Sequence, residues 1–128
     1  MKILVFGNPL LEFDNLPLKL IPKLQKKFPK IKFSEFDPTE ELEKQGKDLI
    51  IIDTVEDIKK ITIIESIDKI SKTKLYSMHD FDLGYNLKIL KKLNLIDSIK
   101  IIGIPMKISE EDALKGIEQE LKKLINLN

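Results

Sequence analysis

The sequence predicts a three-layer α/β/α sandwich with a mostly parallel sheet of about five strands, and it allows an antiparallel strand at one edge. Apolar runs at residues 3–6, 49–52 and 98–104 are typical of strands that helices cover on both faces. Segments with apolar residues at helical spacing alternate with these runs, as the crossovers between parallel strands require. The 128 residues suit one core, so we expect a single domain over residues 1–128.

The first half of the chain carries two predicted strands and two helical segments. The run at residues 3–6 ends at Gly7-Asn8-Pro9, which is a turn signal. Residues 31–36 alternate apolar and polar side chains, which predicts a partly buried strand, and residues 40–45 suit a short helix. A helix is predicted at residues 15–28, where four apolar side chains share one face: Leu16, Leu20, Ile21 and Leu24.

The second half begins with the purest apolar run, residues 49–52, which predicts a central parallel strand that Asp53 directly follows. Residues 61–64 are β-branched and suit an edge strand. A helical turn is expected at 66–71, a strand-like segment at 74–78 and a helix at 83–94. A strand follows at 98–104, which Gly103 and Pro105 stop. The final helix is opened by a capping box at 109–112.

The composition excludes several classes of function. A net charge of +1 provides no field for a polyanion, so we expect neither a nucleic-acid nor a membrane partner. Cysteine is absent and histidine occurs once, as His79, which excludes thiolate metal sites, a cysteine nucleophile and sites that need two histidines. No apolar stretch approaches the length of a membrane span, and the first residues do not resemble a signal peptide. We therefore expect a cytoplasmic protein, and a monomer.

Three residues at predicted chain reversals form the strongest candidate site. Asp53 follows the most buried strand, Asp14 lies in the segment after the first strand, and His79 lies between a strand-like segment and a helix. Ligands of such sheets bind at the carboxyl ends of the strands, so these side chains are expected to converge. Two carboxylates and one imidazole would suit a divalent ion such as nickel or zinc, and without metal they could act as an acid/base group.

Five segments in this order resemble the hydrogenase maturation endopeptidases, which process the large subunit of nickel–iron hydrogenases. Residues 7–14, GNPLLEFD, are similar to the family's G-N-x-L-x-x-D-[DE]. Residues 36–39, FDPT, resemble its D-x-G-T turn, and residues 49–54, LIIIDT, resemble its apolar strand ending in D-A. Residues 77–84, SMHDFDLG, resemble its S-x-H-x-x-x-L/G segment, and residues 101–105, IIGIP, its G-I-x-P strand end.

The resemblance implies a specific activity and a specific site. Family members remove a C-terminal extension from the hydrogenase large-subunit precursor, and nickel already bound in that precursor is the recognition signal. Asp14, Asp53 and His79 match the metal-contacting positions of the family and would act as both the catalytic and the metal-contacting residues of an aspartyl-type endopeptidase. The nickel would be carried by the substrate, not held by the enzyme. Substrate-contacting positions would be Asn8, Asp37 and Thr39.

Departures from the family pattern keep other functions open. Phe13 replaces the first acid of the acidic pair, and the glycine of the D-x-G-T turn is missing before Thr39. One alternative is therefore a family member that binds a metalloprotein partner without cutting it. A receiver-like phosphoacceptor domain, with Asp53 as acceptor, is a second alternative, although the acidic pair expected after its first strand is replaced by Phe6-Gly7-Asn8. A nucleotide-binding module is disfavoured because the first turn lacks the further glycines.

Overall fold

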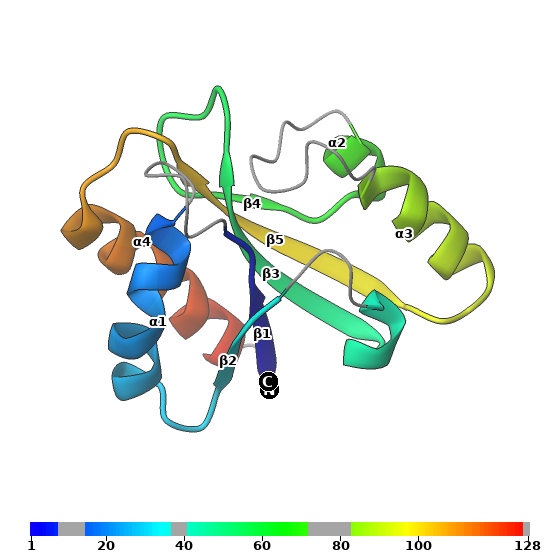
Figure 1. Ribbon diagram of the computed structural model, residues 1–128, viewed down its shortest axis with the longest axis horizontal. Coiled ribbons are helices and arrows are strands. Elements are labelled where there is room, and N and C mark those ends of the chain that lie inside the picture. Colours follow the sequence, from blue (N-terminus) through cyan, green and yellow to red (C-terminus); the bar gives the residue numbers. More distant parts are fainter. Residues whose placement is uncertain (8–14, 37–40, 72–82, 127–128) are drawn as a thin grey trace.

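The computed structural model describes residues 1–7, 15–36, 41–71 and 83–126 and contains one five-stranded sheet flanked by helices (Figure 1). The strands are β1 (Lys2–Val5), β2 (Lys32–Glu35), β3 (Asp48–Val55), β4 (Thr62–Ile64) and β5 (Ser98–Pro105). The helices are α1 (Leu16–Lys27), the short 3-10 helix η1 (Leu42–Gln45), α2 (Ile67–Ser71), α3 (Leu83–Lys92) and α4 (Glu110–Asn126). None of the helices within these described residues is long and apolar enough to cross a membrane.

The sheet has the strand order β2-β1-β3-β5-β4. The pairs β1–β2, β1–β3 and β3–β5 are parallel, whereas the edge strand β4 runs antiparallel to β5. The most extensive pairing joins β3 and β5, whose ladder runs from Asp48 and Ser98 to Val55 and Pro105. The predicted fold class, a mostly parallel sheet with one antiparallel edge, is confirmed.

Two apolar layers lie on opposite faces of the sheet. One face is covered by α1 and α4, whose buried side chains Leu20, Leu24 and Ile117 pack against Ile52 and Ile102 of the central strands. The other face is covered by α2 and α3. There, buried Leu87 and Leu90 belong to the same cluster as Ile51, Val55 and Ile101. Neighbouring residues of β3 and β5 thus serve different layers, as strands buried on both faces require.

Local sequence signals account for two helix ends. The Ser109 hydroxyl accepts a hydrogen bond of 3.0 Å from the Asp112 backbone N–H, which confirms the predicted cap of α4. Helix α3 ends at Lys92, and Asn94, two residues later, adopts a left-handed φ of 61°. The backbone N–H groups of Asn94 and Leu95 donate to the carbonyls of Lys91 and Leu90, at 3.0 and 2.9 Å. These paired bonds form a Schellman motif, which fixes the path of the chain beyond α3.

The boundaries of both long strands differ from the prediction. Strand β3 does not stop before Asp53 but continues to Val55, because residues 53–55 pair with residues 103–105. Likewise, Gly103 lies within β5 and does not stop it, and Pro105 occupies the last position of the ladder. Extended pairing across two strands therefore overrides the local break signals of an aspartate, a glycine and a proline.

Candidate functional site

Asp53 is the one predicted site residue that the structure describes, and it lies inside the central strand β3. Its position pairs with Gly103 on β5, while on the other side of β3 the Phe6 N–H donates to the Ile52 carbonyl at 2.9 Å. The Asp53 side chain is fully buried, with an exposed fraction of 0%. A buried carboxylate at the carboxyl end of a central parallel strand is unusual, and Asp53 is therefore a candidate functional residue.

The pleat of β3 places Asp53 on the face of the sheet that α2 and α3 cover. Residues of β3 at alternate positions, Leu49, Ile51 and Val55, belong to that apolar layer. One carboxylate oxygen, Oδ1, accepts a hydrogen bond of 2.8 Å from the Thr54 backbone N–H. This bond orients the carboxylate locally. Because the side chain is fully covered, contact with any ligand requires covering atoms to move aside.

The β5 position that pairs with Asp53 is Gly103, which carries no side chain. A Cβ atom at Gly103 would lie 2.9 Å from Cγ2 of Val55, 3.3 Å from the Thr62 carbonyl oxygen and 3.4 Å from Cδ1 of Ile58. The neighbouring strand β4 and the loop after β3 therefore approach β5 closely beside Asp53 only because this position is glycine. The sequence pattern predicts that Gly103 stops the strand, whereas the structure places it inside β5. The apolar residues on both sides of Gly103, Ile102 and Ile104, were the signal that could have placed it inside the strand.

Two aromatic residues hold together the ends of β1 and β2. The rings of Phe6 and Phe36 stack with centroids 5.1 Å apart and an interplanar angle of 21°, and both side chains are buried. Phe6 follows β1 and Phe36 follows β2, so the stack fixes the two points from which residues 8–14 and 37–40 continue. These points lie at the same sheet edge as Asp53 because β1, β2 and β3 are parallel.

The other predicted site residues lie outside the described residues: Asn8, Asp14, Asp37, Thr39 and His79. Their convergence on Asp53 therefore stays a prediction. The strand-like segment predicted at residues 74–78 also lies outside them. Among the residues that the structure does describe, no group of three or more His, Asp or Glu side chains could hold a metal ion.

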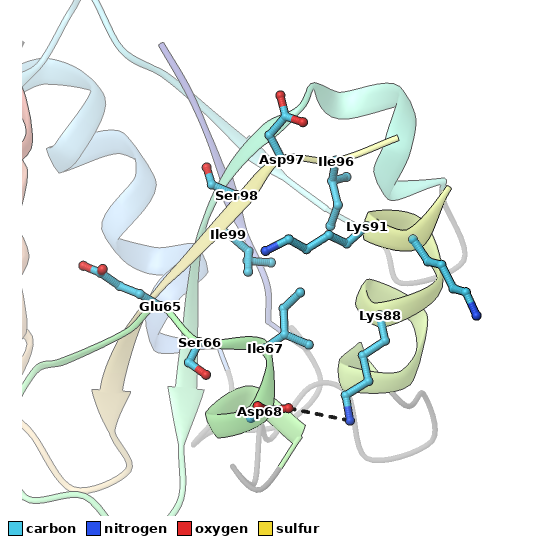
Figure 2. A pocket seen from close by; sticks show the side chains of 11 residues that line it. Glu65, Ser66, Ile67, Asp68, Lys88, Lys91, Ile96, Asp97, Ser98 and Ile99 are labelled. Carbon is cyan, nitrogen blue, oxygen red and sulfur yellow. Dashed lines mark ion pairs between the residues drawn. The ribbon is translucent and has the colours of Figure 1, made fainter. Parts of the chain in front are cut away.

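A groove of about 480 Å³ lies between α2, α3 and the start of β5, at the amino end of that strand and away from Asp53 (Figure 2). Its apolar lining includes Ile67, Ile96 and Ile99. Figure 2 shows Lys88 of α3 paired with Asp68 of α2 across it, with Nζ and Oδ1 3.8 Å apart. Sequence reasoning missed this groove because it depends on how α2 and α3 pack on the sheet.

The fold is similar to those of several solved structures. A crystal structure of the hydrogenase 3 maturation protease has a TM-score of 0.62 and 22% identity over 94% of this chain and 88% of that chain. A solution structure of the endopeptidase HycI from Escherichia coli has a TM-score of 0.59 and 21% identity over 96% and 90%. An uncharacterized protein from Wolinella succinogenes has a TM-score of 0.53 and 15% identity over 98% and 94%.

These likenesses span nearly the whole of each chain, and at such identities they establish a shared fold. No family model matches the sequence, and no curated protein matches it.

Proposed function

We propose that this protein is an endopeptidase that removes a C-terminal extension from a nickel-loaded [NiFe]-hydrogenase large-subunit precursor. The observation that carries the proposal is the buried carboxylate of Asp53 at the carboxyl end of the central strand, in a chain that shares its fold over 94% of its length with a hydrogenase 3 maturation protease. The motif order along the sequence supports the same activity: two of the five resembling segments follow β1 and β2, two lie within β3 and β5, and one runs into α3.

The proposed reaction is hydrolysis of one peptide bond. A water oxygen adds to the scissile carbonyl, the carbon–nitrogen bond breaks, and the products are a new carboxylate and a free amine. Asp53, Asp14 and His79 would contact the nickel that the substrate carries and orient the scissile bond beside it. Oxygen and imidazole donors suit nickel, and their mixed set leaves coordination positions for groups of the precursor. Asn8, Asp37 and Thr39 are proposed to contact the substrate chain.

The burial of Asp53 gives this proposal a structural consequence. A carboxylate with no exposed surface can meet a precursor-bound nickel only when the atoms that cover it make way. Substrate binding and uncovering of Asp53 are therefore coupled, and the free energy for uncovering must come from contacts with the precursor.

The sheet does not support a receiver-like domain. Receiver domains of the flavodoxin-like class have the order 2-1-3-4-5. Here the fifth strand lies between the third and the fourth, and the edge strand is antiparallel.

Two aspartates at opposite ends of β3 provide a matched test of the proposal. Asp53→Asn keeps an oxygen that can accept from the Thr54 N–H but removes the charge, so we expect cleavage of nickel-loaded precursor to fall by at least about a hundredfold. His79→Ala should abolish cleavage in the same assay. Asp48→Asn changes an exposed carboxylate at the amino end, where Asp48 accepts from the Ser98 hydroxyl at 2.7 Å.

Cleavage is followed by the intact mass of the precursor, and thermal unfolding checks that each variant is folded. We expect Asp48→Asn to cut at the wild-type rate. Full activity of folded Asp53→Asn would remove Asp53 from the site. Tight binding of the precursor without any cleavage by wild type would instead establish the non-catalytic alternative.

A further inference from the structure

Large apolar side chains that face solvent gather on one helix. Among the described residues, the exposed ones are Tyr85 (63%), Ile89 (39%), Leu93 (61%) and Leu95 (41%) on and just after α3, with Met1 and Ile125 elsewhere. Single exposed apolar residues are ordinary, whereas a contiguous group on one element marks an interaction surface. Leu95, which follows the end of this helix, belongs to the exposed group.

These side chains form a stripe along the outer side of α3. Tyr85, Ile89 and Leu93 are spaced by four residues, and the Leu93 N–H donates to the Ile89 carbonyl at 3.0 Å, so the helical path continues to Leu93. The opposite side of the helix is buried through Leu87 and Leu90. The Schellman motif at Asn94 then fixes Leu93 and Leu95, so the stripe is already formed before any partner arrives.

The stripe has a positive border. Helix α3 carries Lys88, Lys91 and Lys92 and has no acidic residue. Lys88 is half exposed and reaches Asp68 only at 3.8 Å, so most of its charge is available to a partner. In Figure 2, the Lys91 side chain extends across the groove between α2 and α3. A partner that covers this surface must bring apolar side chains bordered by carboxylates.

The direction of α3 joins this surface to the candidate site. Helix α3 precedes β5, which is parallel to β3, so α3 runs back towards the amino edge of the sheet, where β5 begins (Figure 1). A protein bound along the stripe from Leu93 towards Tyr85 therefore points at the edge where Asp53 lies. In the sequence, α3 also begins four residues after His79.

We propose that the stripe formed by Tyr85, Ile89, Leu93 and Leu95, with its lysine border, is the docking surface for the hydrogenase large-subunit precursor. This inference rests on the proposed function, and it names where on this chain the body of the precursor binds while its C-terminal extension reaches Asp53. The matching surface of the precursor presents apolar side chains flanked by carboxylates.

Two charge variants test the docking surface, each with a control on α4. Ile89→Asp should raise KM for nickel-loaded precursor by about tenfold or more and change kcat less than about twofold, as loss of a binding contact remote from the chemistry does. Ile125→Asp makes the same change at an isoleucine of similar exposure and should leave KM unchanged. Lys88→Glu should raise KM at low salt, and the difference should shrink at high salt. Lys115→Glu is its control, since Lys115 is also exposed and lies 3.9 Å from a carboxylate.

If the wild-type protein cuts the precursor and KM is unchanged in folded Ile89→Asp and Lys88→Glu, the docking surface is overturned. The proposed function is then left intact. If wild type binds precursor without cutting it, the proposed function fails, and the docking surface is judged by whether Ile89→Asp weakens that binding. Sedimentation that shows a wild-type dimer, lost in Ile89→Asp, would assign the stripe to a second copy of the chain and overturn the proposal.

Discussion

At the scale of single residues, Asp53 shows how far the sequence pattern predicts the structure. The pattern of an apolar run followed by an aspartate placed this carboxylate at the carboxyl end of the central strand, and the structure confirms that location. The pattern did not show that the residue is inside the ladder and fully buried. Burial at this position depends on pairing with β5, about fifty residues away in the chain, which a local pattern cannot reveal.

Gly103 provides a prediction about packing beside Asp53. Gly103→Ala places a Cβ 2.9 Å from Cγ2 of Val55, closer than ordinary packing permits, so the variant should lose about 1–3 kcal/mol of unfolding free energy. Chemical denaturation measures the loss. Removing the obstructing methyl groups in Val55→Ala should make Gly103→Ala less costly, so the double variant loses less than the sum of the two single losses. Strict additivity would contradict the close contact.

At the scale of elements, the helices and strands were predictable where a local period existed. The apolar faces of α1 and α4 and the cap at Ser109 could be recognised from the sequence. The α3 stripe could not, because Leu87 and Leu95 are the same residue type, and only packing determines that Leu87 is buried and Leu95 exposed. Five of the six predicted site residues lie outside the described residues, so the arrangement of those segments is still a prediction from the sequence.

Helices α1 and α4 are connected by ion pairs that predict a pH dependence of stability. Lys27 Nζ donates to Glu118 Oε2 at 2.9 Å, and this hydrogen bond is the main cause that lowers the pKa of the Glu118 carboxyl. A carboxylate whose pKa is lower in the folded state adds stability above its unfolded pKa, about 4.3, and loses it as the pH falls through the folded value. Lys27→Met should therefore lower Tm slightly at pH 7, and the difference from wild type should vanish in acid.

Lys26→Met is the control for this measurement, because the structure shows no carboxylate contact for this exposed neighbour among the described residues. The Tm of Lys26→Met should differ from that of wild type by the same amount at pH 7 and at pH 3. A deficit of Lys27→Met that persists unchanged at pH 3 would show that the Lys27–Glu118 contact does not account for the lost stability.

At the scale of the whole molecule, alternation of apolar runs and helical periods was sufficient for the layer architecture. Strand order was not predictable in this way, because β5 is inserted between β3 and β4 and only the complete sheet shows it. The same topology places Asp53 and the Phe6–Phe36 stack at one end of the sheet. The candidate site at that edge and the proposed docking surface along α3 both lie on the side of the sheet that α2 and α3 cover.

The central claim is tested most directly by the intact mass of a nickel-loaded hydrogenase large-subunit precursor after incubation with this protein. We expect one product that is shorter by its C-terminal extension, and no shortening when the same precursor lacks nickel. A precursor whose C-terminus stays intact, under conditions in which an established maturation protease cuts it, would contradict the account.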